Sequence, residues 1–439
     1  MTRNFFITLV FGFISQTGWA QGFDRIKLDN YFDTLEKHDK FMGSVAVSQK
    51  GKLIYTKSAG FSDIENNIRA NENSKYRIGS ISKTFTAVLA LKAVEEKKLD
   101  IDQALDKFLP SIPNAQKITV RQLLNQRSGI HNYTAYPDYL TWNTKPHTEK
   151  EMVEIISKGG SDFEPGSKFG YSNSNYILLT YIIEKSFKKS YAALLTKYIT
   201  QPAGLKNTYL GGEIKTSANE CKSYKFMNGW QPEPETDVSV SSGAGGIVST
   251  PTDLVKFSDA LFSAKLLKPE SLELMKTIKD NYGMGLFQAP FYDKTAYGHT
   301  GGIDGFTSVF EHFSDGDLSY ALTSNGTNFN NNDISIAVLS AAYNKPFSIP
   351  RFNTYSLSPE ELDRYTGVYA SKQIPSKITI SKQGKTLMAQ ATGQAAFPLE
   401  AAEKDKFIFD QAGVVMEFDP DKKTMILKQG GGQYQFTKE

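Results

Sequence analysis

A serine and a lysine stand three residues apart in the segment RIGSISKTFTA, residues 77–87. Ser80 follows a glycine and opens an apolar stretch that predicts a helix over residues 80–98. At a helix N-terminus, unpaired backbone N–H groups and the positive end of the helix dipole favour negative charge on the hydroxyl oxygen. Lys83 follows one turn later on the same face, and a lysine that burial keeps neutral can take the serine proton. The pair is therefore a candidate nucleophile and base, the alternative being a capping serine beside a surface lysine.

A tyrosine and an asparagine two residues apart could extend this site. Tyr171 and Asn173 occur in EPGSKFGYSNSNYILL, residues 164–179, where a Pro-Gly turn precedes an apolar helix. A phenol can relay a proton to or from a nucleophile, and an amide can hold a substrate carbonyl or the lysine. A polar helix cap is the alternative. A second S-x-x-K pattern at residues 186–189 has lysine-rich surroundings that indicate a solvated helix end.

A third candidate stretch is YGHTGGIDGF, residues 297–306, which follows a strand-like pattern. It contains His299, Thr300, Gly301 and Gly302 in succession. Glycines allow a substrate to lie along the backbone edge of a strand, and the N–H of Gly302 could join that of Ser80 in an oxyanion hole. The alternative is a glycine-rich turn.

The remaining patterns predict the elements that must bring these stretches together. Helical spacing occupies residues 23–41, an alternating pair of runs at 43–61 predicts a hairpin, and residues 118–200 read as mainly helical. An amphipathic helix is predicted over 251–267, and strand-like alternation returns near 297–325. Strands at both ends with helices between them predict an α+β domain, with an antiparallel sheet joining the first and last strands and a separate helical lobe.

The amino-acid composition of the chain changes near residues 345–365, where proline and polar residues indicate a linker. Short alternating runs at regular spacing follow, so we expect a small all-β, barrel-like domain over residues 355–439.

The first twenty residues predict a secretory signal. Arg3 precedes an apolar run over residues 5–14, and small residues lead to a cleavage site near Ala20. The run is too short to span a bilayer, so we expect an exported protein, periplasmic or secreted, with no transmembrane segment after cleavage; an uncleaved anchor is the alternative.

Composition excludes several function classes. The 50 basic and 47 acidic residues give no case for binding nucleic acid or an anionic membrane. Cys221 is the only cysteine, so no intrachain disulfide can form. The five histidines are scattered, and we expect no dedicated metal site and no cofactor.

The order S-x-x-K, Y-x-N and H-T-G resembles the penicillin-recognising serine hydrolases. These include class C-type β-lactamases, D-alanyl-D-alanine carboxypeptidases, D-aminopeptidases and related esterases. Three further segments match: ITVRQLLNQRSGI (118–130), GAGGIVSTPTDLVKF (243–257) and YGMGL (282–286). The resemblance implies a β-lactamase/transpeptidase-like catalytic domain over 22–348, and ELDRYTGVY (361–369) resembles a lipocalin-like β-domain appended to some members.

The resemblance also implies an acyl-enzyme route. It assigns catalysis to Ser80, Lys83 and Tyr171, substrate binding to Asn173, His299, Thr300 and Gly301, and an oxyanion hole to the backbone of Ser80 and Gly302. Which of Lys83 and Tyr171 is the first base stays open.

The substrate class stays open on sequence alone. His299 stands where many relatives carry lysine, and a neutral imidazole holds a carboxylate less strongly than an ammonium does. No arginine occurs between Arg127 and Arg351 to grip a terminal carboxylate. We expect a small-molecule or peptide substrate, such as a peptidoglycan fragment. Among the possible activities, a peptidase or carboxypeptidase on D-amino-acid peptides ranks first, a small-ester carboxylesterase second and a weak β-lactamase third. A non-catalytic protein that binds penicillin or peptidoglycan fragments is the rival from another class; the oligomeric state is left open.

Overall fold

A six-stranded antiparallel sheet is the centre of the larger domain in the computed structural model, which describes residues 23–439 except 228, 353–354 and 356. The strand order is β10-β11-β12-β13-β1-β2. The strands are β1 (Phe41–Gln49), β2 (Lys52–Ala59), β10 (Phe287–Phe291), β11 (Lys294–Ile303), β12 (Phe306–Phe313) and β13 (Leu318–Thr327). β1 pairs with both β2 and β13, which confirms the prediction that the first and last strands meet.

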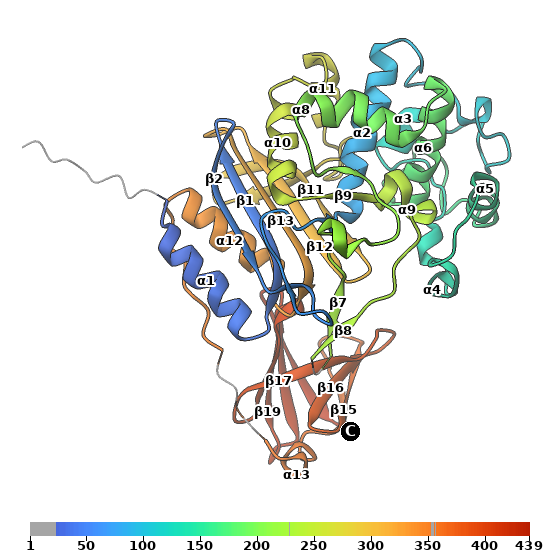
Figure 1. The fold of residues 1–439 in the computed structure, drawn as a ribbon. Helices are drawn as coiled ribbons and strands as arrows, with labels where there is room; N and C mark the ends of the chain where they lie inside the picture. Colours follow the sequence, from blue (N-terminus) through green and yellow to red (C-terminus); the bar gives the residue numbers. More distant parts are fainter. Residues whose placement is uncertain (1–22, 228, 353–354, 356) are drawn as a thin grey trace, which may run out of the picture.

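Two helices cover one face of this sheet (Figure 1). They are α1 (Arg25–Lys37) and α12 (Asn331–Ala342), from opposite ends of the domain. Leu28 and Phe32 of α1 and Val338 of α12 are buried there with Val45 and Leu322 of the sheet. The helical spacing predicted over residues 23–41 therefore corresponds to an apolar stripe on α1, and this stripe is buried against the sheet.

The helical lobe lies against the other face (Figure 1). Its helices are α2 (Ser82–Glu95), α3 (Val120–Leu124), α4 (Tyr139–Trp142), α5 (Glu149–Lys158), α6 (Asn173–Phe187), α7 (Tyr191–Leu195), α8 (Gln201–Ala203), α9 (Val238–Gly245), α10 (Pro251–Phe262) and α11 (Pro269–Lys276). Short strands connect them: β3 (Phe61–Asp63), β4 (Ile68–Arg69), β5 (Tyr76–Arg77), β6 (Tyr209–Leu210), β7 (Tyr224–Phe226), β8 (Trp230–Pro232) and β9 (Ile247–Ser249). α6 and α9 pack on α2, and α10 lies across the sheet.

α2 runs through the middle of the lobe and is buried on nearly every side. Phe85 stacks on Phe257 of α10 with ring centroids 3.8 Å apart, and Phe257 in turn contacts Phe310 of β12. These contacts lock α2 to the sheet, so the residues at its start keep a fixed position relative to β11.

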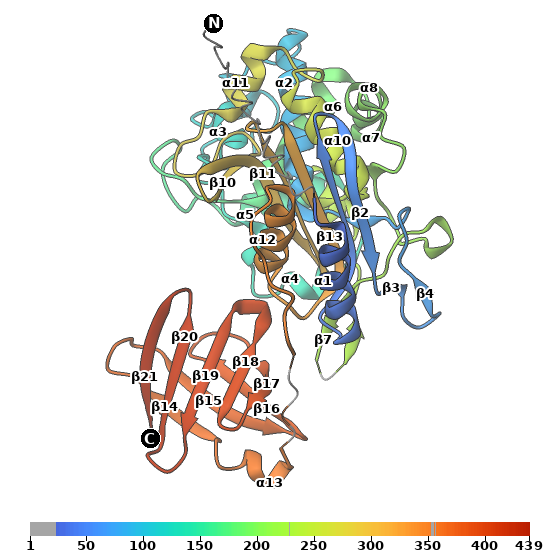
Figure 2. The same cartoon turned by 90° about the vertical axis from the view of Figure 1, so that its left-hand side faces the viewer.

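The C-terminal domain is a closed eight-stranded barrel (Figure 2). Its strands are β14 (Gly367–Ala370), β15 (Lys377–Gln383), β16 (Thr386–Ala391), β17 (Phe397–Glu403), β18 (Lys406–Phe409), β19 (Val414–Asp419), β20 (Thr424–Gln429) and β21 (Gly432–Lys438), preceded by α13 (Pro359–Leu362). Tyr365, Tyr369, Phe407 and Phe436 are buried in its core. The barrel that the alternating runs predicted is confirmed.

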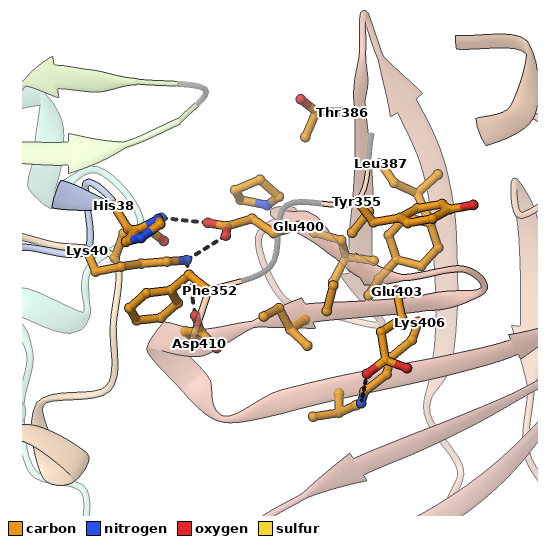
Figure 3. Close-up of a pocket in the computed structure, with 18 of the residues that line it drawn as sticks. His38, Lys40, Phe352, Tyr355, Thr386, Leu387, Glu400, Glu403, Lys406 and Asp410 are labelled. Carbon is orange, nitrogen blue, oxygen red and sulfur yellow. Dashed lines mark hydrogen bonds and ion pairs between the residues drawn. The ribbon is translucent and has the colours of Figure 1, made fainter. Parts of the chain in front are cut away.

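The barrel contacts the end of the sheet at which β1 begins and β13 ends. The Lys40 amine forms ion pairs with Glu400 and Asp410 of the barrel, and Asn328 donates to Glu400 (Figure 3). A cavity of about 740 Å³ lies beside these contacts, between the two domains.

No helix within residues 23–439, the four masked positions apart, is long and apolar enough to cross a membrane. The predicted signal and its cleavage site at Ala20 lie outside the described residues.

Candidate active site

The serine and lysine of the first motif are brought together at the start of α2. Ser80 lies in a 3₁₀ turn, Gly79–Ile81, which continues directly into the helix. The Lys83 Nζ is 2.9 Å from Ser80 Oγ. Ser80 is half-buried, whereas Lys83 has no solvent exposure. The predicted helix is therefore correct in place, but its first turn is tighter than an α-helix.

Three oxygen atoms surround the Lys83 amine. Besides Ser80 Oγ, these are Asn173 Oδ1 at 2.7 Å and the carbonyl oxygen of Ala244 at 2.7 Å. No carboxylate forms an ion pair with this amine in the described part of the chain. Burial, which disfavours the charged form, holds the pKa of Lys83 well below its usual value.

Tyr171 and Asn173, at the start of α6, lie next to Ser80 and Lys83. Tyr171 lines one cavity together with Ser80, and burial raises the pKa of the phenol, so it is a neutral hydroxyl at ordinary pH. The Asn173 amide nitrogen donates to Thr134 Oγ1 at 3.1 Å and lies 3.3 Å from Asn132 Oδ1. These two contacts fix the amide so that its oxygen faces Lys83.

The third motif lies on β11, along the edge that β10 leaves open. β10 pairs with β11 only as far as Gly298, so residues 299–303 have β12 on one side and the site on the other. Thr300 and Gly302 are exposed at this edge. An ideal Cβ at Gly301 would lie 2.0 Å from the carbonyl oxygen of Ile78, so only glycine allows this close approach.

Gly79 and Gly302 form the second close contact between the turn and the strand. Gly79 has φ +49°, and a Cβ there would lie 2.7 Å from the backbone nitrogen of Gly302. The backbone next to Ser80 is thereby held against that of Gly302.

His299 lines the cavity at Ser80 with a side chain that is almost fully buried. Its side chain is 2% exposed, Nε2 is 3.3 Å from the Tyr282 hydroxyl and Nδ1 is 2.5 Å from the Thr300 carbonyl oxygen. Burial, with the nearby Lys83, lowers its pKa to about 3. Nδ1–H therefore donates to the carbonyl, and Nε2 accepts from the tyrosine. The imidazole is neutral and supports the strand, while Thr300 faces the solvent.

Two cavities meet at Ser80. One, of about 540 Å³, is lined by Asn173, Ala244 and Ile303 among others. The other, of about 350 Å³, is lined by Tyr171, Thr300 and Phe169 among others. A scissile bond at Ser80 would thus have a separate space on each side.

The structure also separates the second S-x-x-K from the site. Ser186 lies in the last turn of α6, where its hydroxyl donates to the carbonyl of Ile182. Three groups around Asn173 and Lys83 were not predicted from the motifs: Asn132, Thr134 and the Ala244 carbonyl. Ala244 lies in GAGGIVSTPTDLVKF, so that match was the one available signal.

Comparisons with known proteins place the chain in a family. The Beta-lactamase family model matches residues 28–345. Penicillin-binding protein 4* of Bacillus subtilis (strain 168) is 25% identical over 451 residues, which cover 93% of this chain and 97% of that protein. Teichoic acid D-alanine hydrolase of Staphylococcus aureus is 29% identical over 284 residues, 63% of this chain and 69% of that protein. A structure of D-amino acid amidase from Ochrobactrum anthropi SV3 complexed with D-phenylalanine has a TM-score of 0.64 at 27% identity and covers 72% of this chain and 98% of that one.

The fold and the hydrolases among these relatives define the class, a serine hydrolase in general terms. Within that class the chain belongs to the Beta-lactamase family, and the resemblance inferred from the sequence motifs is confirmed.

Proposed function

We propose that this protein is a serine hydrolase that forms an acyl-enzyme on Ser80 and acts on peptides containing D-amino acids. The observation that carries the proposal is the buried Lys83 amine, 2.9 Å from Ser80 Oγ and without an ion-pair partner among the described residues. A lysine in such a place is a base rather than a cation.

The hydrogen-bond geometry supports the proton transfer. A neutral amine has two N–H donors and one lone pair. The Asn173 and Ala244 oxygens, each at 2.7 Å, take the two donors, which leaves the lone pair facing Ser80 Oγ. Lys83 can therefore accept the serine proton as Ser80 attacks a carbonyl carbon. The backbone N–H groups of Ser80 and Gly302 would stabilise the negative charge that develops on the carbonyl oxygen.

Departure of the leaving group needs a proton on the leaving atom. Tyr171 lines the same cavity as Ser80, and because burial raises its pKa, the phenol holds its proton at ordinary pH. Tyr171 can thus donate to the leaving nitrogen or oxygen, and Lys83 can then restore the phenol proton. Water entering from the same side would release the acyl group by the reverse sequence. Asn173 and Thr300 are the groups that we assign to holding the substrate.

The substrate class rests on the relatives. One is a teichoic acid D-alanine hydrolase and another a D-amino acid amidase, so the proposed substrates carry a D-amino acid at the scissile bond. Peptide hydrolysis, including carboxypeptidase action, is the leading activity. We also propose that the protein is exported by its N-terminal signal and works in the periplasm or outside the cell.

A rate comparison tests the proposal. A D-alanyl-D-alanine peptide, a D-amino acid amide, a nitrophenyl ester and a cephalosporin are assayed with the wild type and Ser80→Ala, with L-isomers of the first two as controls. We expect kcat/KM to be highest for the D-peptide, lower for its L-isomer, and at background in Ser80→Ala. Equal rates with D- and L-isomers would contradict the substrate class, and full activity in Ser80→Ala would contradict the mechanism.

A further inference from the structure

A carboxyl group that the proposed mechanism does not use lies one strand away from the active-site edge. Glu311 is on β12, between Tyr320 of β13 on one side and Gly298 of β11 on the other, and the glycine has no side chain to cover it. It lines a cavity of about 260 Å³ together with Phe287 and Ala289 of β10, Thr300 of β11 and Val309 of β12. The walls of this cavity are mainly apolar, and Glu311 is its only acidic lining residue.

This cavity adjoins the active site. Phe287, His299 and Thr300 line both the Glu311 cavity and the 350 Å³ cavity that contains Ser80 and Tyr171. The two spaces therefore meet over Thr300, at the edge of β11. A molecule bound at Ser80 that extends past Thr300 would approach the carboxyl group.

Glu311 has no partner in the described part of the protein. No hydrogen bond or ion pair involves its carboxylate, and burial alone raises its pKa to about 7. A half-buried carboxylate among apolar side chains has lost hydration that nothing in the chain replaces. A ligand that brings a positive charge and hydrogen-bond donors would supply what is missing.

The side of the active site indicates which part of a substrate would reach Glu311. Tyr171, the residue proposed to protonate the leaving atom, lines the cavity that joins Glu311. Asn173 and Ala244 line the cavity on the other side of Ser80. The Glu311 cavity therefore extends from the leaving-group side of the scissile bond.

We propose that Glu311 forms a subsite that binds a primary ammonium group in the leaving portion of the substrate. The inference rests on the proposed function and narrows it: the preferred leaving group carries an amine rather than ending in a free carboxylate close to Thr300. A carboxylate placed there would face Glu311 and would be disfavoured by like charge.

Binding to a non-reactive variant tests the subsite directly. The ligands are amides of N-acetyl-D-alanine with 1,4-diaminobutane and with n-pentylamine, which have the same length but end in an ammonium and a methyl group. Diamines of two to five methylenes, each with its methyl-ended match, cover the range of reach. Calorimetry on Ser80→Ala should show one ammonium ligand binding about tenfold or more tightly than its match. Ser80→Ala with Glu311→Gln should lose that preference, and Ser80→Ala with Glu273→Gln, an exposed glutamate on α11 that pairs with Lys276, should keep it.

Two results would overturn the subsite: equal affinity for both members of every pair, or a preference that survives Glu311→Gln. A second measurement needs no variant at Glu311. In protein with ¹³C-labelled glutamate carboxyl groups, the ammonium ligand should lower the pKa of Glu311 and the methyl-ended ligand should not; an unchanged pKa contradicts the proposal. Because both measurements report binding, failure of the wild type to cleave any of these amides would count against the proposed function alone.

Discussion

Replacing Lys40 by methionine should loosen the barrel from the catalytic domain. Lys40 is 3% exposed, and its Nζ lies 2.5 Å from Glu400 Oε2 and 3.1 Å from Asp410 Oδ2, both on the barrel (Figure 3). Methionine keeps most of the side-chain volume but removes the charge, and with it the cation–π contact of the Lys40 amine with Phe352. The substitution therefore leaves two carboxylates at the interface without their shared cation.

The expected cost follows from the burial of the three groups. Removing one partner of a buried ion pair costs about 3 to 5 kcal/mol. Glu400 is 41% exposed and keeps a 2.7 Å hydrogen bond from Asn328, so its share of the cost is reduced. Asp410 is 19% exposed, and burial already raises its pKa. We therefore expect the lower end, about 3 kcal/mol.

Lys406→Met is the matched control. Lys406 lines the same cavity, but its pair with Glu403, at 3.0 Å, lies between side chains that are 33% and 65% exposed. An exposed pair contributes about 1 kcal/mol or less.

Urea unfolding gives the loss of stability, and the rate of proteolytic cleavage in the linker 345–358 reports docking. Lys40→Met should unfold at lower urea and be cleaved faster than Lys406→Met. Adding Glu400→Gln and Asp410→Asn to Lys40→Met should restore a large part of the loss, because the uncompensated charges are gone. If Lys40→Met and Lys406→Met lost the same stability, or if the two carboxylate substitutions restored none of it, the ion pairs of Lys40 would not be what holds the barrel to the catalytic domain.

Further substitutions probe the catalytic domain. Gly79→Ala should lower the unfolding free energy by about 1 to 3 kcal/mol, because Gly79 has a positive φ and lies against Gly302, and it should lower kcat more than tenfold. Gly160 is the control, because it has φ +68° but open space around it. Gly160→Ala should cost only about 1 kcal/mol and leave kcat unchanged. His299→Gln should make the protein less sensitive to acid. The pKa of His299 is about 3 in the folded state and about 6.5 in the unfolded chain. As the pH falls below 6.5, the unfolded chain takes up a proton that the folded protein does not, so the free energy of unfolding decreases. At pH 5 this loss is about 2 kcal/mol. The difference in unfolding free energy between the wild type and His299→Gln should therefore change by about 2 kcal/mol between pH 7 and pH 5. A difference that stays constant would contradict the burial of His299.

Much of the site could be predicted because its first pair is local. The spacing of Ser80 and Lys83 places both on one helical turn, and that relation needs no tertiary structure. The other contacts of Lys83 come from 90 and 161 residues away in the chain. The Ala244 contact uses a backbone carbonyl, which any residue type supplies, so the residue's identity carries no signal.

His299 illustrates a different limit. Its motif placed it at the site, but the direction of its side chain depends on Tyr282 and Phe287, which pack around the ring from outside β11. Alternation along a strand gives the face of each residue but not what covers that face. The sequence therefore predicted the position and not the burial.

The fold was predicted best where one face of an element is buried. Alternation located the barrel strands, and the meeting of β1 with β13 followed from the order of the elements. The helix predicted over 251–267 ends at Phe262, and the segment expected to be mainly helical between 118 and 200 contains long connections. One of them carries Asn132 and Thr134, whose hydrogen bonds to Asn173 fix the loop in place of a helix.

The central claim, that Ser80 is the nucleophile, is tested most directly by trapping it. Intact-protein mass spectrometry after treatment with a fluorophosphonate, followed by peptide mapping, is compared for the wild type and Ser80→Ala. We predict one adduct per wild-type chain, located at Ser80, and none on Ser80→Ala. An adduct of the same yield on Ser80→Ala, or an adduct mapped to Ser186, would contradict it.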